Sequence, residues 1–373
     1  MTENPSRDIF PWLCLYLISG VGNVGCRKLI EHFGSAEEIF RSSVPALMEA
    51  GELRESAARK ITEKVFSIDP EQEMKRIEQI GARIIPFPDS SYPSLLREIH
   101  DPPVLLYSRG KPIPPGQHFI AIVGSRNATD YGRRTAQKIA LGLTENGIGI
   151  SSGLARGVDA SAHWGCVRGQ GFTIAVLGTG VDIRYPRSNA KLFEKVLEQG
   201  AVVSEFPLGT APEPKNFPMR NRIISGVSRG VVVVEATRQS GSLITAGLAL
   251  EQGRDVFAVP GSVDSFKSRG PHFLIKQGAK LVEHAEDILS EIGYFYAPDN
   301  QGADEDVERP GVRLEPEEKR VFDCLGPYPM HIDQIIRSTG CAPGETSSIL
   351  TRLELMGLII QMPGMMFVRA QQG

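Results

Sequence analysis

Two arginines follow apolar strand patterns, in loops whose composition suits the binding of an anion. Arg126 stands in the loop after the run 119–123, and Arg156 stands in the loop after the run 148–151. Each loop is rich in small residues and leads into a helical pattern, which places backbone N–H groups and a helix N-terminus at the end of a strand. Guanidinium groups bind phosphate oxygens through paired hydrogen bonds. These loops therefore predict a phosphorylated ligand.

Two later loops carry further candidates for the same ligand. One holds several cations around Phe217, and the other, at 240–242, has small residues that would let a phosphate approach the amides of the following helix. Aromatic rings among cations are typical of single-stranded nucleic acid sites, where cations hold phosphates and rings stack on bases. The predicted binding residues are Gly124, Ser125, Arg126, Gly153, Arg156, Lys215, Phe217, Arg220, Asn221, Arg222, Ser240, Gly241 and Ser242.

The same loops contain acids and histidines, but the sequence indicates no catalytic site. Asp159, Glu205 and Glu235 are placed where they could cap helices or orient the arginines. His163 follows Asp159 by four residues on a helical pattern, and we interpret it as a packing residue. The sequence has no Walker P-loop, no H-E-x-x-H motif and no carboxylate cluster suited to Mg²⁺. We expect a binding protein without catalytic residues, metal ion or cofactor.

The composition is that of an ordinary globular protein. Of 373 residues, 41% are hydrophobic and 23% charged, and the formal charge of −3 excludes a generally polycationic nucleic-acid binder, so any such site must be local. No apolar run approaches the roughly 20 residues of a membrane span, and the start of the chain lacks a signal-peptide pattern. The five cysteines show no C-x-x-C spacing, so neither a disulfide framework nor a zinc site is expected. The expected location is the cytoplasm.

The chain divides by pattern into four parts. Residues 1–67 predict a helical domain of SAM-like or helix-hairpin-helix-like type, and 68–293 an extended Rossmann-like α/β domain. Strand patterns at 82–86, 104–108, 119–123, 148–151, 173–177, 201–204, 231–235 and 255–259 alternate with helical ones, which favours a doubly wound, mostly parallel sheet. Residues 294–313 are acidic and contain Gly and Pro, which predicts a linker, and 314–373 predict a winged helix-turn-helix.

Two of these parts could contact DNA outside the sheet. The turn at 20–22, followed by Arg27 and Lys28, is similar to a helix-hairpin-helix that grips a phosphate, although short motifs of this kind also serve as plain helix joints. In the winged helix, acids outnumber cations, and its third helix offers few base-reading side chains beyond Arg352. A role in protein binding or in tuning a dimer is therefore favoured for the tail.

Seven ordered motifs resemble the DNA-processing protein A family (DprA or Smf). They are DPPVLLYSRG at 101–110, GSR at 124–126, SGLARGVD at 152–159, LGTGVD at 177–182, FPMRNRII at 217–224, SGSLITA at 240–246 and VPG at 259–261. The resemblance implies a Rossmann-like domain that binds single-stranded DNA and forms a homodimer. It also implies protection of incoming DNA in natural transformation and loading of the RecA recombinase, without enzymatic activity.

The resemblance has one departure and leaves two rival functions open. His272 stands where family members often carry Asn, which leaves the role of its loop open between phosphate binding and helix capping. The first rival is a phosphoribohydrolase similar to lysine decarboxylase-like proteins, but Ile244 and Thr245 occupy the places of the catalytic carboxylates. The second rival is a regulator that binds DNA through the winged helix.

Overall fold

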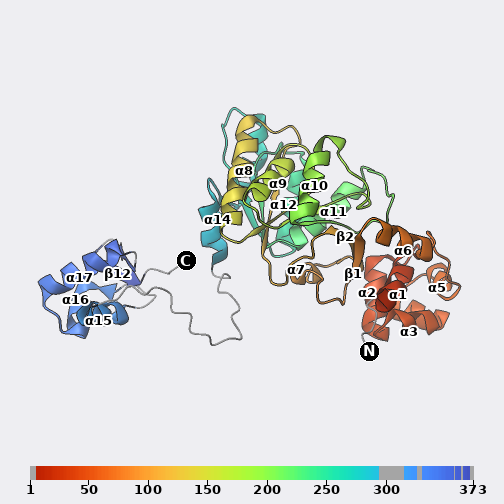
Figure 1. The fold of residues 1–373 in the computed structure, drawn as a ribbon, viewed down its shortest axis with the longest axis horizontal. Helices are drawn as coiled ribbons and strands as arrows, with labels where there is room; N and C mark the ends of the chain where they lie inside the picture. The colour runs from red at the N-terminus through yellow and green to blue at the C-terminus, as the bar shows by residue number, and fades with distance from the viewer. Residues whose placement is uncertain (1–5, 294–314, 326–329, 357, 363, 370–373) are drawn as a thin grey trace. The chain divides into compact units, whose positions relative to one another are not determined.

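The computed structural model describes residues 6–293, 315–325, 330–356, 358–362 and 364–369 (Figure 1). The described residues up to 293 form one compact unit, and those from 315 onward form a second. The predicted linker 294–313 lies outside the described residues. No helix of the described ranges is long and apolar enough to cross a membrane.

A nine-stranded sheet of order β1-β2-β6-β5-β4-β3-β7-β8-β9 forms the centre of the first unit. Seven strands are parallel: β3 (Phe119–Val123), β4 (Gly149–Ser152), β5 (Thr173–Val176), β6 (Ala201–Ser204), β7 (Gly230–Val233), β8 (Asp255–Ala258) and β9 (Lys280–Leu281). Strands β1 (Ala82–Pro86) and β2 (Leu105–Gly110) extend the sheet in the antiparallel sense. The expected extended, doubly wound and mostly parallel sheet is confirmed.

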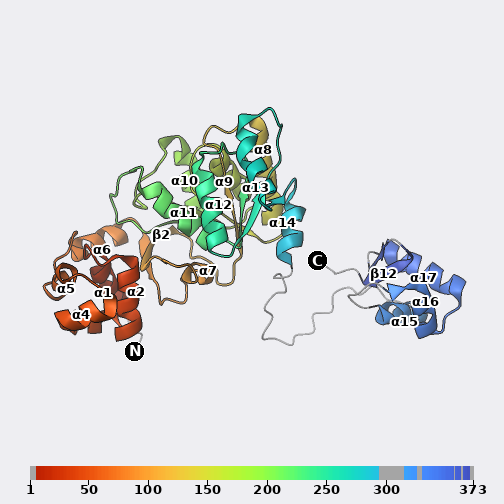
Figure 2. The ribbon, with the colours of Figure 1, turned by 180° about the vertical axis from the view of Figure 1, so that it is seen from behind.

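Helices cover both faces of the sheet, which explains why its central strands β3 to β7 are buried along their whole length. One face buries Ile120 and Ile122 under α8 (Asp130–Glu145), α9 (Val158–Arg168) and α14 (Ala285–Ile292). The other buries Ala121 and Val123 under α11 (Asn216–Gly226), α12 (Gly241–Glu251) and α13 (Arg269–Lys276). Figure 2, the reverse view, shows α11, α12 and α13 side by side. Helix α10 (Ala190–Gln199) packs on β2, β5 and β6.

The strand order reverses between β3 and β7. The chain runs from β3 outward through β4, β5 and β6 in one direction, and from β7 through β8 and β9 in the other. Loops that leave two such neighbouring strands in opposite directions open a crevice at the carboxyl end of the sheet, where open α/β sheets bind ligands. The turn that holds Arg126 follows β3, and the loop that holds Ser240 follows β7.

The N-terminal helices are part of the same compact unit. They are α1 (Ser6–Tyr16), α2 (Gly22–Phe33), α3 (Ala36–Arg41), α4 (Val44–Gly51) and α5 (Glu55–Thr62), and α6 (Pro70–Gln79) and α7 (Ser94–Arg97) follow. Leu13 and Leu17 of α1 share one apolar cluster with Leu105 and Tyr107 of β2. The helices therefore pack onto the antiparallel edge of the sheet, as Figure 1 shows, through a continuous core.

The second unit is a winged helix. Its helices α15 (Pro316–Cys324), α16 (Ile332–Thr339) and α17 (Pro343–Leu355) surround Val321, Ile335, Leu353 and Phe367. A small sheet of order β10-β12-β11 completes it, with β10 (Met330–His331), β11 (Ile359–Met362) and β12 (Met366–Arg369). The predicted order of three helices and a hairpin is confirmed.

Candidate nucleic-acid interface

A pocket of about 460 Å³ lies at the crevice between β3 and β7. Its wall contains side chains from the turn after β3, from the first residues of α11 and from the first turn of α12. The lining residues are Val123, Gly124, Arg126, Ala155, Asp159, Tyr185, Pro212, Pro214, Phe217, Pro218, Arg220, Asn221, Ile224, Ser240, Gly241, Ser242, Ile244 and Thr245. Eight of the predicted binding residues thus meet in one pocket, and its size is that of a small-molecule site.

The N-terminus of α8, the first expected phosphate site, is occupied by a carboxylate of the protein itself. Buried Glu235 accepts a hydrogen bond from the Thr129 amide at 2.9 Å and another from the Thr129 hydroxyl. The Thr129 hydroxyl oxygen in turn accepts from Gly132 N at 3.0 Å. The Ser125 amide donates to the Glu235 carbonyl at 2.7 Å. Helix α8 is therefore capped internally, and the predicted contact of Ser125 with a phosphate would not use its backbone N–H, which is already engaged.

The second expected cradle is filled in the same way. The carboxylate of Asp159 accepts from the amides of Gly153 at 3.2 Å and Ala155 at 3.4 Å. Gly153 is buried, and a Cβ there would lie 2.5 Å from Arg220 Nη2, so the glycine is needed for the close approach of this guanidinium. Burial raises the pKa of Asp159, and nearby Arg220 opposes that shift. The Gly153 amide is thus already engaged within the protein, which does not favour the prediction that Gly153 binds a phosphate.

The N-terminus of α12 is the third cradle, and it faces the pocket. Ser240, Gly241 and Ser242 all line the pocket, and a Cβ built on Gly241 meets no atom within 4 Å. Ser242 N makes a long hydrogen bond, 3.4 Å, to Ser240 Oγ, and Leu243 N donates to the Ser240 carbonyl at 3.0 Å. The space beside Gly241, at the positive end of the helix dipole, is thus open. An anion can approach this turn closely.

Aromatic rings lie beside this cradle. The rings of Tyr185 and Phe217 are tilted by 37°, with their centroids 5.7 Å apart. Arg126 Cζ lies 5.4 Å from the centroid of Phe217, and Arg220 Cζ lies 5.9 Å from it. Arg126 and Tyr185 are exposed, and Phe217 is half-buried. The pocket therefore combines the ring faces of Phe217 and Tyr185 with the exposed guanidinium of Arg126. A stacked base next to a phosphate requires groups of these two kinds.

Arg220 lines the pocket from within the protein. Its Nη1 donates to the Gly153 carbonyl at 2.9 Å and also to the Val176 carbonyl, so the guanidinium closes the ends of β4 and β5. Burial lowers its pKa to about 10, and Asp159 opposes that shift. Arg220 therefore remains charged at neutral pH, and its charge adds to the positive potential at the pocket floor.

The remaining predicted cations lie outside the pocket lining. Arg156 is exposed on its loop, and Lys215 is exposed and forms an ion pair with Glu213 at 2.8 Å. Arg222 is buried, with its Nη2 2.6 Å from Glu205 Oε2. The prediction that Arg222 contributes to the phosphate site is therefore not favoured, because two carboxylates, those of Glu205 and Asp101, engage its guanidinium.

Several lining residues were missed or given another role. Pro212 and Pro214 were not expected at the site, and nothing in their sequence context distinguishes them from ordinary loop residues. Asp159 and Glu235 were expected to cap helices or orient arginines, and the structure confirms hydrogen bonds of that kind. The signal for Glu235 was its position just after β7, from which an acid can reach the amides of a neighbouring loop, whereas Asp159 lies in the first turn of α9.

The two histidines have structural contacts. His163 is buried, and its Nδ1 lies 2.7 Å from Thr173 Oγ1; burial, followed by repulsion from Arg220, lowers its pKa to about 3. The interpretation of His163 as a packing residue is confirmed. His272 Nε2 lies 3.0 Å from the Gly261 carbonyl and so ties its helix to the loop after β8. Within the described residues, no group of three or more His, Cys, Asp or Glu side chains could hold a metal ion.

Both peripheral DNA candidates are engaged within the protein. Arg27 Nη1 donates to the His100 carbonyl at 3.1 Å, and Lys28 Nζ lies 2.5 Å from Glu52 Oε2. In the winged helix, Arg352 Nη1 lies 3.0 Å from the buried carboxylate of Glu318. These contacts favour a structural role for the hairpin-like turn. They also give Arg352 a partner within the protein, while its side chain stays 54% exposed.

Comparison with known proteins gives two family models that match the chain. The model described as DNA recombination-mediator protein A matches residues 83–293, and the one described as DprA winged helix domain matches residues 305–365. Protein Smf of Synechocystis sp. is 36% identical over 395 residues, which covers 96% of this chain and 98% of the relative. DNA processing protein DprA of Streptococcus pneumoniae is 43% identical over 232 residues, covering 62% of this chain and 81% of the relative.

Two solved structures are similar to this one. The structure of DNA processing protein A from Streptococcus pneumoniae superposes with a TM-score of 0.67 and 37% identity, covering 74% of this chain and 95% of that chain. The structure of DNA processing protein A from Helicobacter pylori, described as having a unique single-stranded DNA binding mode, gives a TM-score of 0.51 and 26% identity, covering 58% and 97% of the two chains. The chain therefore belongs to the DNA recombination-mediator protein A family, whose members are named DprA or Smf.

Proposed function

We propose that this protein binds single-stranded DNA in the pocket between β3 and β7. The observation that carries the proposal is the pairing of an open helix N-terminus at Ser240–Ser242 with the Arg126 guanidinium beside the Phe217 ring. A phosphate would lie on the amides of α12, and Arg126 would neutralise it or its neighbour. An adjoining base would stack on the rings of Phe217 and Tyr185.

The pocket geometry favours an unpaired strand over a duplex. A base can enter a recessed pocket and stack on aromatic rings only when it is free of its Watson–Crick partner, and opening a duplex costs a few kcal/mol per base. The contacts are to phosphates and to ring faces, which every nucleotide has. Binding should therefore depend little on base sequence.

The role in the cell follows from the family. The related protein of Helicobacter pylori is described as binding single-stranded DNA, which supports the same ligand for this chain. We infer protection of incoming single strands in natural transformation, loading of RecA onto them, and action as a homodimer through the Rossmann-like unit. These finer roles rest on the family resemblance, and the pocket supports their shared first step, capture of the strand.

The proposal is tested by titrating a labelled oligothymidine and a blunt duplex of equal length at several salt concentrations. We expect tighter binding of the single strand, and a log–log salt slope of about −0.7 per phosphate neutralised. Equal affinity for both ligands would contradict the assignment of base stacking to the pocket. The Glu205 and Arg222 pair, buried outside the pocket, offers no phosphate contact and is not expected to contribute to the slope.

Among the alternative functions, hydrolysis of a nucleotide has the most structural support, because the pocket is large enough for a nucleoside monophosphate. Ile244 and Thr245 line it at the places where carboxylates would be needed for that chemistry. The carboxylates of Asp159 and Glu235 are engaged by backbone amides, so they serve the fold instead. Release of free base from nucleoside monophosphates, lost on substitution of Thr245, would favour the enzyme over the binding protein.

A further inference from the structure

The N-terminal helices and the pocket helix α11 meet at one buried carboxylate, that of Glu205. Arg222, on α11, donates from Nη1 to Glu205 Oε1 at 3.1 Å and from Nη2 to Glu205 Oε2 at 2.6 Å. Its Nε donates to Asp101 Oδ2 at 2.8 Å. The side chains of Arg222 and Glu205 are only 8% and 4% exposed. Neither group can exchange this partner for water without a change in the fold, because an unpaired buried charge is strongly unfavourable.

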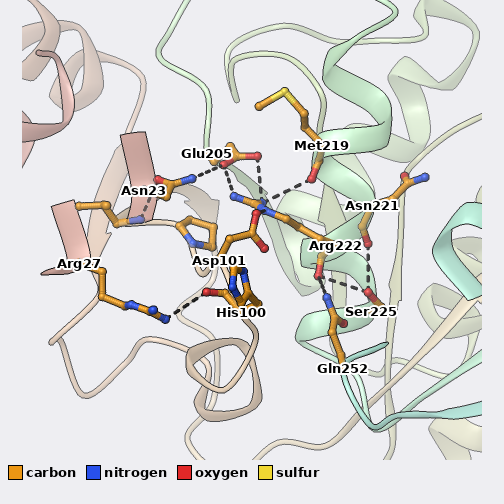
Figure 3. A network of polar contacts seen from close by, with 12 residues as sticks. Asn23, Arg27, His100, Asp101, Glu205, Met219, Asn221, Arg222, Ser225 and Gln252 are labelled. Atoms are coloured by element: carbon orange, nitrogen blue, oxygen red, sulfur yellow. Dashed lines mark hydrogen bonds and ion pairs between the residues drawn. The ribbon is translucent and has the colours of Figure 1, made fainter. Parts of the chain in front are cut away.

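Both α1 and α2 contact this same residue, Glu205. The side-chain amide of Asn23, from the start of α2, donates to Glu205 Oε2 at 3.3 Å (Figure 3), which is the oxygen that Arg222 Nη2 also binds. Asn23 Oδ1 accepts from the backbone amide of Val104 at 3.3 Å. The hydroxyl of Tyr16, on α1, donates to the Glu205 carbonyl. Two N-terminal helices therefore fix the residue that orients Arg222.

Arg222 and the pocket-lining residues lie on different sides of helix α11. Phe217, Arg220 and Asn221 line the pocket, and Arg222 follows Arg220 by two residues, which turns its side chain to a different side of the helix. The carbonyl of Arg222 also accepts from Gln252 Nε2, at the end of α12, at 3.1 Å. A shift of α11 would therefore move the Phe217 ring and the Arg220 guanidinium relative to the α12 cradle.

We propose that Arg222 is a positioning residue for DNA binding, and that Glu205 couples the docking of the N-terminal helices to the geometry of the pocket. The proposal rests on the proposed binding of single-stranded DNA. Asn23 and Tyr16 hold Glu205, Glu205 holds Arg222, and Arg222 holds α11 with Phe217 and Arg220 in place. Because coupling between two sites is reciprocal, a strand bound in the pocket stabilises the contact of α1 and α2 with Glu205.

The test uses mild variants of the full-length protein, since Arg222→Ala would leave buried carboxylates without a partner. Asn23→Ala and Tyr16→Phe each remove one hydrogen bond to Glu205 without introducing a charge. Lys28→Ala is the matched control, because Lys28 lies on the same helix but pairs with Glu52 inside the helical bundle. The two readouts are hydrogen–deuterium exchange along α11 in the free protein and affinity for labelled oligothymidine at several salt concentrations.

We expect Asn23→Ala and Tyr16→Phe to speed exchange in α11 and to weaken oligothymidine binding about 2- to 10-fold, the equivalent of one hydrogen bond. The salt slope should stay that of the wild type, because no phosphate contact is lost. Lys28→Ala should change neither readout. Wild-type exchange in α11, or faster exchange with unchanged affinity, would overturn the proposal. If the wild type itself does not bind the strand, the proposed function fails. Hydrogen–deuterium exchange in α11 then decides by itself whether the contacts of Asn23 and Tyr16 with Glu205 position this helix.

Discussion

The guanidinium carbon of Arg126 lies 5.4 Å from the centroid of the Phe217 ring, although Arg126 lies in the loop after β3 and Phe217 in the first turn of α11. A cation near an aromatic face is attracted by the ring quadrupole. An exposed cation of this kind loses far less hydration than the charges of a buried ion pair do. Arg126 remains exposed, so its donors stay available. The contact therefore sets a phosphate-binding group and a stacking surface side by side.

Removal of Arg126 should weaken binding of every strand sequence alike. Arg126→Ala is expected to make the salt slope shallower by about 0.7, the contribution of one phosphate on a single strand. Lys215→Ala should have a similar effect, because its ion pair with Glu213 is exposed and contributes little to holding the lysine. Titrations at several salt concentrations measure both slopes. Arg133→Ala is the control, since Arg133 pairs with Asp130 on α8 and belongs neither to the predicted binding residues nor to the pocket lining. Unchanged salt slopes in both test variants would show that Arg126 and Lys215 do not contact the strand.

Loss of the Phe217 ring should weaken binding by a different route. Phe217→Ala is expected to cost about 1–3 kcal/mol of binding free energy, with a salt slope close to that of the wild type, because a stacked ring neutralises no charge. Comparison of affinities at each salt concentration measures both quantities. Thermal unfolding of the free protein serves as the control, since Phe217 also contacts Tyr185. A slope that changed as much as in Arg126→Ala would show that the ring acts through its arginine neighbour.

Gly241 should be required for binding but not for folding. A Cβ at Gly241 meets no protein atom within 4 Å, so Gly241→Ala leaves the fold intact, but the added methyl group occupies the approach of a phosphate to the amides of α12. Gly247→Ala is a matched control on the same helix, where a Cβ also meets nothing and where alanine should stabilise the helix by about 0.5–1 kcal/mol. Weaker strand binding is expected in Gly241→Ala alone. Equal affinities of the two variants would move the phosphate away from this turn.

His163 should make the first unit less stable in acid. Thr173 Oγ1 donates to the Ile150 carbonyl, so Nδ1–H of His163 donates to Thr173 and the buried ring is neutral. Burial, with repulsion from Arg220, lowers its pKa from the usual 6.5 to about 3. Between these values the unfolded chain binds a proton that the folded protein excludes, so this contribution to the free energy of unfolding is present above pH 6.5 and is lost as the pH falls toward 3.

Comparison of the wild type with His163→Asn isolates this contribution. Asparagine keeps a donor near Thr173 but does not titrate, so its free energy of unfolding should fall less steeply between pH 6.5 and pH 4 than that of the wild type. Denaturant unfolding at a series of pH values measures both slopes. Acids with raised pKa values, such as Asp159 and Glu205, are present in both proteins and cancel in the difference. Parallel curves would show that His163 is not buried neutral in solution.

Removal of the winged helix should leave strand binding largely unchanged. The unit has its own apolar core around Ile335 and Leu353, and its arginine at 352 pairs with Glu318 instead of facing a ligand. A chain that ends before residue 312 is therefore expected to fold and to bind oligothymidine with nearly the affinity of the full chain. Parallel titrations of the two proteins measure the difference. A large loss of affinity in a truncated protein with an unchanged thermal transition of the first unit would assign DNA contacts to the tail.

Local sequence determined the strands, the helices and the edge of the sheet at which the site lies. Apolar runs such as 119–123 specify buried strands, and the loops after them must emerge at the carboxyl edge, so Arg126 and Ser240 could be assigned to one edge of the sheet from order along the chain. The winged helix could likewise be predicted from the sequence, because each of its helices and its hairpin depends on a short-range pattern of apolar residues.

Tertiary structure alone decided which loop amides and cations remain available. Glu235 caps α8 from 106 residues away, and Arg222 pairs with Asp101 across 121 residues and with Glu205 across 17. No local pattern distinguishes an arginine that faces a ligand from one that pairs with a distant carboxylate, because both have the same flanking residues and the same propensities. The difference arises only when packing brings the partner within hydrogen-bond distance and removes the pair from water, as it does for Arg222 but not for Arg126.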